Sequence, residues 1–489
     1  MKKRPNILFL QTDQQRHDAL GCVNPAIRTP NLDALAARGT RFSQAVCNVP
    51  MCVPSRYSMM TGLYGFQCGV KHNTQMIARD TDLPVPVLAQ RLAEAGYQTA
   101  GFGKTHWYIG SRIMPGTPIE GSCRGFEIRA LRGAREPGND ECGALYMADD
   151  EPEQHARVAG VQKHGGPGGE SVEGYTGGIS GLDASHHAEG WLARQALNFL
   201  DQGRDATRPF FLYLSLDYPH VPLFPPKPFE DLYAGTDFPD NPPPDPVPSG
   251  HAIRSKFKEI WPNMTSEQRR CAWMRYAALC SFVDDCFGQV IEKLHAKGEL
   301  DNTLVLFASD HGDMMGERGR VSKYCLYESS VRVPLILAGP GVEQAGTADD
   351  RLAELVDVMP TLLAAAGEEI PECLPGLNLL SAESRSGAFA EMHGGGYEDC
   401  QQAPSVMWRT ADWKLILHVP GRLGDIHGRY DRIDGELFDL ADDPRELNNR
   451  YEDPVCAPIR ERMTAQALMH VMCCLGRFPG GPSRAKIEG

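Results

Sequence analysis

Short apolar runs alternate with longer segments of helical periodicity over the first two thirds of the chain. Five apolar runs are expected to form buried parallel strands: Asn6–Leu10, Gln98–Phe102, Phe210–Leu216, Thr303–Ala308 and Leu335–Ala338. Between them, apolar residues recur with helical spacing in three segments: Pro84–Ala95, His187–Leu200 and Ser266–Lys297. Strands that alternate with helices predict an α/β domain built around a large, mostly parallel sheet that is flanked by helices.

Two other segments of this region show neither pattern. The segment from Gly110 to Gly181 is rich in glycine, and we expect it to be a loop-rich insertion over one face of the sheet. Loops of that length often carry function. Residues Phe238 to Pro248 are rich in proline and predict a rigid, extended connection.

The pattern changes after residue 380. Three short runs predict antiparallel strands, and one segment has helical spacing: Val406–Thr410, Leu415–His418, Glu436–Leu440, and the helix Ala457–Met472. We therefore predict a large α/β domain over residues 1–380, with the insertion at 110–181. A smaller α+β subdomain with an antiparallel sheet is predicted over residues 381–489.

Polar side chains follow four of the predicted strands at the point where each strand ends. The clusters are Asp13-Gln14, Lys104-Thr105-His106, Asp217-Tyr218-Pro219-His220 and Asp310-His311. Taken singly, each has an ordinary explanation, such as a helix N-cap for Asp13 or a hydrogen-bonded buried histidine for His106 or His220. In open parallel sheets, however, ligands bind at the carboxyl ends of the strands. The recurrence therefore predicts one functional rim that all four clusters share.

A further candidate is Cys52, which opens the segment Cys52-Val53-Pro54-Ser55-Arg56. Most cysteines simply fill a core. Here, however, Pro54 suits the first position of a helix and Gly62 suits its end, so position 52 faces the positive end of a short helix. That end favours an anion or an oxyanion, and Arg56 adds a fixed positive charge one turn further on.

The rim residues include a candidate metal site. Four side chains offer carboxylate oxygens, an amide oxygen and an imidazole: Asp13, Gln14, Asp310 and His311. Oxygen ligands suit calcium, magnesium or manganese, and a histidine shifts the balance toward manganese. A basic cluster follows at Arg318, Arg320 and Lys323, of which Lys323 is the residue that we place in the site.

The overall charge and composition limit the partners. The 489-residue chain has a formal net charge of −14, which argues against nucleic acid or an anionic membrane, because both attract a basic surface. No apolar run is long enough to span a membrane, and the stretch Ile7 to Leu10 is too short for a signal peptide. Fifteen cysteines without a secretory signal are typical of reduced thiols, so we expect a cytoplasmic protein.

Motifs in these segments resemble one enzyme family. They are Pro5-Asn6-Ile7-Leu8, Thr29-Pro30-Asn31-Leu32-Asp33, Cys52-Val53-Pro54-Ser55-Arg56, Gly103-Lys104-Thr105-His106, Pro219-His220-Val221-Pro222, Ser309-Asp310-His311-Gly312 and Glu436-Leu437-Phe438-Asp439-Leu440. In this order, and across nearly the whole chain, they are similar to the type I, formylglycine-dependent sulfatases of the alkaline phosphatase superfamily. The resemblance implies an alkaline-phosphatase-like fold, with a large α/β domain and a smaller C-terminal domain that contains an antiparallel sheet.

The resemblance also implies how the nucleophile and the metal are held. Cys52 would be oxidised to formylglycine, an aldehyde, by a separate formylglycine-generating enzyme. Arg56 would steady the formylglycine. One divalent metal ion would be bound by the modified Cys52 and by the four side chains named above: Asp13, Gln14, Asp310 and His311.

The remaining candidates receive roles toward the substrate, which the resemblance implies is a small sulfated molecule. Lys104, His220 and Lys323 would bind the sulfate or assist the leaving group. Both His220 and Lys323 are candidates for the general acid. His106 would lie beside the formylglycine hydroxyl. No oligomeric state follows from the resemblance.

One position departs from the usual sulfatase pattern. Many sulfatases carry two aspartates where this chain has Asp13-Gln14, a pairing that resembles choline sulfatases and phosphonate monoester hydrolases. With one carboxylate fewer, manganese stands beside calcium, the family's usual ion. Lys104 and His106 match the sulfatase pattern, so we predict hydrolysis of a sulfate monoester of a sugar, aryl or small alkyl alcohol. The alternatives are a phosphonate or phosphate ester hydrolase with the same site, and a non-catalytic anion-binding protein.

Overall fold

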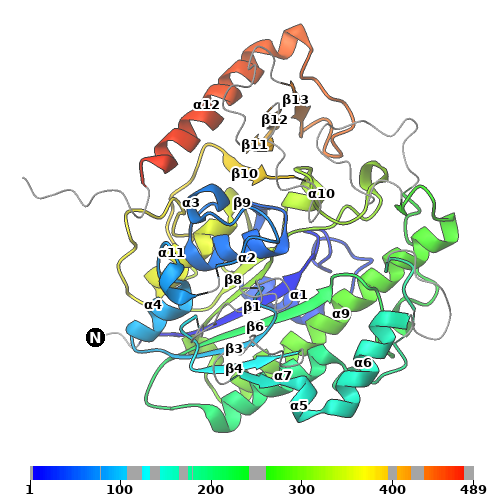
Figure 1. The fold of residues 1–489 in the computed structure, drawn as a ribbon, viewed down its shortest axis with the longest axis vertical. Coiled ribbons are helices and arrows are strands. Elements are labelled where there is room, and N and C mark those ends of the chain that lie inside the picture. The colour runs from blue at the N-terminus through cyan, green and yellow to red at the C-terminus, as the bar shows by residue number, and fades with distance from the viewer. Residues whose placement is uncertain are drawn as a thin grey trace, which may run out of the picture.

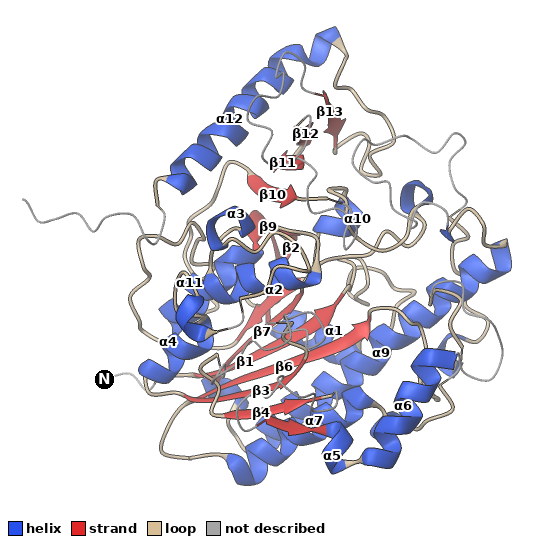
Figure 2. Cartoon of the chain, viewed as in Figure 1, coloured by secondary structure: helices blue, strands red, loops and turns tan. Residues whose placement is uncertain are grey.

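A nine-stranded sheet runs through the larger part of the molecule (Figure 1, Figure 2). The computed structural model describes residues 4–77, 79–106, 124–132, 144–164, 174–178, 180–241, 260–394, 405–419 and 434–477. The strand order is β5-β4-β3-β6-β1-β7-β8-β2-β9, and neighbours pair in parallel except β8, which is antiparallel to both β7 and β2. The strands are β1 Asn6–Asp13, β2 Gly39–Val46, β3 Gln98–Gly103, β4 Ile128–Leu131, β5 Ala144–Tyr146, β6 Phe210–Pro219, β7 Thr303–Ser309, β8 Leu335–Ala338 and β9 Thr347–Glu354.

Helices cover both faces of this sheet. Leu8 and Leu10 of β1 pack with residues of α1, α7 and α9, whereas Ile7 and Phe9 pack with residues of α2, α4 and α11. A strand buried on both faces is typical of a parallel sheet. The helices are α1 Pro30–Arg38, α2 Cys52–Thr61, α3 Gly65–Cys68, α4 Leu88–Glu94, α5 Met147–Asp150, α6 Pro152–His164, α7 Ala188–Asn198, α9 Ser266–Ala296, α10 Glu328–Val331, α11 Val358–Ala365 and α12 Ala457–Leu475.

A second, four-stranded antiparallel sheet follows in the C-terminal region. Its strands, in spatial order, are β10 Ala388–Met392, β11 Ser405–Arg409, β12 Trp413–His418 and β13 Asp434–Asp439. One face of this sheet packs on Met51 and Tyr327 of the larger part, through residues such as Phe438. The opposite face packs on α12, which runs along the top of Figure 1 in red. The small sheet is therefore joined to the segment that immediately precedes Cys52.

The structure confirms the predicted fold class. All five predicted strands and all three long predicted helices are present, with ends that shift by a few residues. The three C-terminal strands and the terminal helix are also present, the helix as Ala457–Leu475. The domain boundary between residues 380 and 381 stays a prediction. No helix in the described ranges is both long and apolar enough to cross a membrane.

Two expectations are wrong. Leu335–Ala338 is a buried strand, but it is antiparallel rather than parallel. An apolar run reports burial and not direction, and the chain between β7 and β8 contains only the four-residue α10 instead of a long crossover helix. The segment 110–181 is more than a loop-rich insertion, because it contributes β4 and β5 to the sheet. These strands, of four and three residues, are too short to show alternation. Most of the proline-rich stretch 238–248 lies outside the described residues.

Gly103 places the strand end that carries Lys104. Its φ is +94°, and a Cβ there would collide with the carbonyl oxygen of Ser215, which accepts a hydrogen bond from the Lys104 amide at 3.0 Å. Gly96 provides a matched control, because its φ is +90° but no atom of the described residues lies within 4 Å of an added Cβ.

We expect Gly103→Ala to lower the free energy of unfolding by about 2 kcal/mol more than Gly96→Ala, since both substitutions carry the same backbone strain and only the first adds a steric clash. Urea unfolding of the two variants measures the difference. Equal losses would show that β3 and β6 are not held at this close distance.

Candidate active site

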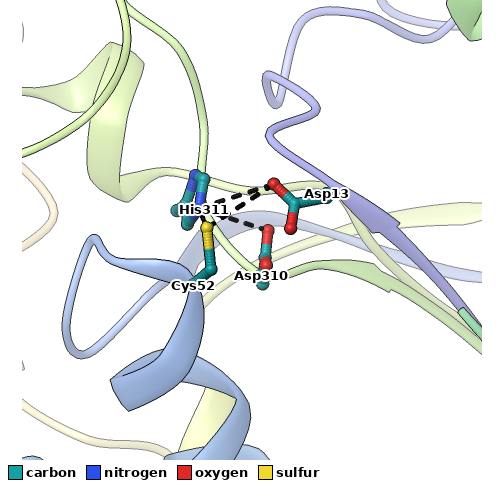
Figure 3. A group of neighbouring side chains, drawn as sticks. All are labelled: Asp13, Cys52, Asp310 and His311. Atoms are coloured by element: carbon teal, nitrogen blue, oxygen red, sulfur yellow. Dashed lines mark hydrogen bonds and ion pairs between the residues drawn. The ribbon is translucent and has the colours of Figure 1, made fainter. Parts of the chain in front are cut away.

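The ends of β1 and β7 bring two carboxylates together (Figure 3). These strands pair in parallel, with Thr12 opposite Ser309, so Asp13 and Asp310 lie side by side just beyond the last paired residues. Asp13, Cys52, Asp310 and His311 each offer one ligand atom, and the four atoms lie within 4.8 Å of one another. All four side chains are buried. Register alone therefore places two negative charges in one buried site.

Helix α2 brings Cys52 to the carboxylates. The helix begins at Cys52 itself, two residues earlier than predicted, because Pro54 occupies the third helical position, which also lacks an intrahelical partner for its backbone nitrogen. The Cys52 Sγ lies 3.1 Å from His311 Nε2 and 3.8 Å from Asp13 Oδ1. The Ser55 hydroxyl donates to the Asp310 carbonyl oxygen at 2.5 Å and holds this end of the helix in place. Gly62 ends the helix as predicted, with φ +68°.

Arg56 forms hydrogen bonds with both carboxylates of the cluster. Its Nε donates to Asp310 Oδ2 at 2.8 Å, and its Nη2 donates to Asp13 Oδ2 at 3.1 Å. Its Nη1 donates to the Lys104 carbonyl oxygen at 2.6 Å and to Ser215 Oγ at 2.8 Å. The planar guanidinium presents donors in several directions at once, which a lysine ammonium could not do with the same geometry. Arg56 therefore fixes the ends of β1, β3, β6 and β7 relative to one another.

The carboxylates titrate differently. Burial alone would raise the pKa of Asp13, but the positive charges of Lys104, His220 and Arg56 outweigh it and hold that pKa well below its usual range. Burial and the neighbouring Asp13 charge raise the pKa of Asp310 to about 7. A metal ion bound between the two carboxylates, in addition to the Arg56 charge, would relieve their repulsion.

Two basic groups approach Asp13 from the ends of β3 and β6. Lys104 Nζ lies 2.8 Å from Asp13 Oδ2 and 3.5 Å from Asp217 Oδ1. Burial opposes its charge, but these two carboxylates raise the pKa of Lys104 above its ordinary value. His220 Nδ1 lies 2.6 Å from the Val221 carbonyl oxygen, so Nδ1 carries the proton and Nε2 faces Asp13 Oδ1 at 4.0 Å. Burial and Lys323 hold the pKa of His220 well below 6.5.

Gln14 and Lys323 form a polar pair beside the cluster. Lys323 Nζ donates to Gln14 Oε1 at 2.5 Å, and the Gln14 amide nitrogen of the backbone donates to Asp310 Oδ1 at 3.1 Å. The side-chain nitrogen of Gln14 donates to Asp313 and Tyr175, whose hydroxyl in turn donates to Asp313 Oδ2 at 2.7 Å. The Gln14 oxygen thus faces Lys323, and its role as a metal ligand stays a prediction.

Asp313 and Tyr175 are not among the site residues predicted from the sequence. Asp313 lies three residues beyond Asp310, so its place after the same strand could have marked it. Tyr175 lies in the glycine-rich segment, where no pattern distinguishes it. Together they orient the Gln14 amide.

His106 lies at the end of the Lys104 loop, with φ +55°. Burial, Lys104 and Arg56 hold its pKa well below 6.5, so the ring is neutral. Its Nδ1 is buried and has no hydrogen-bond partner in the part of the chain that the structure describes. The ring is therefore available to accept a proton.

The structure thus brings all the predicted site residues to one rim. These are Asp13, Gln14, Cys52, Arg56, Lys104, His106, His220, Asp310, His311 and Lys323. The donor set of the cluster fits one divalent cation, because two carboxylates and an imidazole converge on one point beside position 52. Both calcium and manganese accept such a set.

Comparison with known proteins decides the family. The sulfatase family profile matches residues 5–368, and a profile described as N-sulphoglucosamine sulphohydrolase, C-terminal, matches residues 316–471. The chain belongs to the sulfatase family. It is accordingly a sulfuric ester hydrolase.

This sulfatase has relatives with several named substrates. It is 30% identical over 480 residues to the choline-sulfatase of Rhizobium meliloti, with 92% of this chain and 83% of the relative covered. The phosphonate monoester hydrolase of Silicibacter pomeroyi shares its fold, with a TM-score of 0.76, 24% identity and 96% of each chain covered. A structure solved with its substrate D-glucosamine-2-N,6-O-disulfate has a TM-score of 0.70 at 22% identity, and covers 98% of this chain and 100% of that one.

Cation binding to this sulfatase tests the cluster without any turnover. We expect calcium or manganese to raise the unfolding temperature, with a stabilisation of about 2.7 kcal/mol at a hundred times Kd. Asp310→Asn should remove most of this effect, because one of the two carboxylates is lost. Asp301→Asn is the control, since Asp301 is 93% exposed and pairs with Arg38 far from the site. An Asp310→Asn chain that responds as the wild type does would contradict the metal site.

Proposed function

We propose that this sulfatase hydrolyses a sulfate monoester with Cys52 oxidised to formylglycine and one divalent cation bound beside it. The observation that carries the proposal is the position of the Cys52 Sγ, 3.1 Å from His311 Nε2 and at the first turn of α2. The sulfur stands where an oxygen of the modified side chain would be. The proposed ligands of the cation are the modified side chain and four neighbours: Asp13, Gln14, Asp310 and His311.

Two groups that the unmodified chain lacks, the hydrated aldehyde at position 52 and the divalent cation, would supply part of the chemistry. A hydrated aldehyde carries two hydroxyls on one carbon, so one can attack sulfur and the other can later release sulfate as the carbonyl re-forms. A divalent cation supplies Lewis acidity. Arg56 donates to both Asp13 and Asp310 and so holds the two carboxyl groups in position as ligands.

The chain's own basic side chains act on the sulfate. Lys104 contacts Asp13 and Lys323 contacts Gln14, and both would stabilise negative charge on the sulfuryl oxygens. His220 and Lys323 are the two candidates for the proton donor to the leaving oxygen, and Lys323 is favoured because the His220 Nε2 that faces the site carries no proton. The neutral His106 ring, whose Nδ1 has no hydrogen-bond partner among the described residues, would take the proton of the second hydroxyl. Removal of that proton allows sulfate to leave without attack of water at sulfur.

The substrate class extends from sugar to aryl and small alkyl sulfates. The relatives named above act on choline sulfate and on a disulfated glucosamine, so we propose a small sulfated molecule here as well. A cytoplasmic location and maturation by a formylglycine-generating enzyme stay predictions.

Phosphonate or phosphate ester hydrolysis is the second candidate function. It is favoured by Gln14, which stands where many sulfatases have a second aspartate, and by the fold shared with a phosphonate monoester hydrolase. One carboxylate fewer makes the site less repulsive to a phosphate monoester, which can carry two negative charges where a sulfate monoester carries one. Lys104 and His106 favour the sulfatase function over this one.

Cys52→Ser tests the nucleophile. Serine has one hydroxyl, so we expect it to accept the sulfuryl group and to be unable to release it. Intact mass after exposure to an aryl sulfate should show one added sulfate group on the variant and none on the wild type. Cys22→Ser, at an exposed cysteine, serves as the control and should turn over normally. Full turnover by Cys52→Ser would refute the proposed mechanism.

Relative rates separate the two candidate functions. We expect kcat/KM for 4-nitrophenyl sulfate to exceed that for a 4-nitrophenyl phosphonate monoester and a phosphate diester by about tenfold or more, equivalent to about 1.4 kcal/mol. A parallel measurement with Lys104→Met shows whether Lys104 is the source of the preference. A wild type that prefers the phosphonate would establish the second function instead.

A further inference from the structure

The loop between β7 and α10 folds into a narrow hairpin. The Met314 amide donates to the Ser322 carbonyl oxygen at 2.7 Å, and the Gly316 amide donates to the Arg320 carbonyl oxygen at 2.7 Å. The base of the hairpin lies in the active site, because Asp313 binds the Gln14 amide and Lys323 donates to its oxygen. The residues beyond the base of the hairpin are therefore held at a fixed position relative to the candidate metal ligands.

Two arginines near the tip of this hairpin are buried, and most of their nitrogens have no hydrogen-bond acceptor in the part of the chain that the structure describes. Arg320 is 2% exposed and Arg318 is 4% exposed. The Nε, Nη1 and Nη2 of Arg320, and the Nε and Nη1 of Arg318, have no partner among the described residues. A guanidinium carries five N–H donors, and buried arginines normally use them on carboxylates or carbonyl oxygens. This pair leaves most of its donors unused.

The surroundings do not neutralise the two charges. Both guanidiniums lie against the Tyr327 ring, Arg318 at 4.2 Å and Arg320 at 5.5 Å from its centroid, and Arg318 also lies 5.5 Å from the Phe438 ring. Glu436 is the carboxylate that pairs with Arg318, but Tyr327 donates to it at 2.8 Å and His418 contacts it at 3.1 Å. Arg318 Nη2 reaches it only at 3.8 Å. The aromatic faces are a floor on which the guanidiniums stack. Among the described residues, Arg318 has this one distant carboxylate as an ion-pair partner and Arg320 has none.

A buried cation is stable when it is paired and hydrogen-bonded. The group that would complete this site has at least two oxygen acceptors in a compact, anionic arrangement, because several donors converge from two planar guanidiniums. Sulfate and carboxylate have this geometry and bind arginine in a bidentate manner.

We propose that Arg318 and Arg320 form a second anion-binding subsite, which takes an additional sulfate or carboxylate group of the substrate whose sulfate ester lies at the metal cluster. The subsite itself follows from the arginines. Its assignment to the substrate rests on the proposed function.

The chain geometry favours a substrate group over an unrelated anion. Arg320 and Lys323 are three residues apart, so their Cα atoms are separated by at most about 10 Å. The aromatic floor belongs to the same apolar cluster as Met51, the residue before Cys52. One small molecule with two anionic groups could therefore span both sites, and a molecule with a single sulfate could use only the first.

Sodium sulfate is the probe for the subsite. We expect sulfate, titrated against chloride at constant ionic strength, to raise the unfolding temperature of Lys323→Met in a saturable way, since this substitution weakens anion binding at the metal cluster. The double variant Lys323→Met/Arg320→Met should lose that response. Lys323→Met/Arg450→Gln is the matched control, because it removes the charge of an exposed arginine elsewhere in the C-terminal region. Equal sulfate responses in the three chains would overturn the subsite.

A second readout separates binding from support of the fold. Without sulfate, Arg320→Met should unfold at the same temperature as the wild type or at a higher one, because it replaces an uncompensated buried cation by an apolar side chain. An arginine that merely holds the hairpin would lower the unfolding temperature when replaced and would leave the sulfate response of the chain in place, which would also overturn the proposal.

A pair of sugars then tests the assignment to the substrate. We expect the wild type to have a kcat/KM about tenfold higher for D-glucosamine-2-N,6-O-disulfate than for D-glucosamine-6-O-sulfate. Arg320→Met should abolish this preference and keep the rate on the monosulfated sugar. The same loss on both sugars, or an unchanged preference, would refute the assignment. A wild type that turns over neither sugar would refute the assignment to a disulfated sugar, while the sulfate titration still decides whether the subsite exists.

Discussion

The structure of the site depends on two carboxylates that are buried side by side, and on the arginine that donates hydrogen bonds to both of them. Asp13 and Asp310 end neighbouring parallel strands whose register leaves no freedom to move them apart. Without a cation, two such charges in a buried place would repel each other and one would take up a proton. Arg56 donates to both, and through its third nitrogen it reaches the ends of β3 and β6. The rim of the sheet is therefore organised around one buried guanidinium.

The same arrangement explains how a strongly acidic chain can hold an anionic substrate. The net charge of −14 is spread over the molecule, whereas Arg56, Lys104 and Lys323 are concentrated at the cluster. At the close distances of a buried site, a few fixed cations outweigh many screened surface charges. The arginine pair at residues 318 and 320 extends this positive region along the hairpin that begins at Asp313. The hairpin in turn rests on the small sheet, which gives the C-terminal region a structural part in the site.

Much of this organisation could be predicted from the sequence, because it follows from strong local signals. Buried parallel strands are nearly continuous apolar runs, and polar residues at their ends must meet at one rim. The direction of β8 could not be predicted, because direction depends on the connection and not on the apolar run. Strands β2, β4, β5, β9 and β10 were not predicted either, and of these β4 and β5 are very short. The pairing of Gln14 with Lys323, and the isolation of Arg318 and Arg320, arise from contacts between distant segments, which no local pattern reveals.

The proposed mechanism requires that the catalytic side chain at position 52 is an aldehyde made from a cysteine. Mass spectrometry of the tryptic peptide that spans residues 42–56, taken from preparations of different specific activity, tests it most directly. We expect the fraction of this peptide with an aldehyde or its hydrate at Cys52 to rise in proportion to activity. Full activity in a preparation whose peptide carries only the unmodified thiol would contradict it.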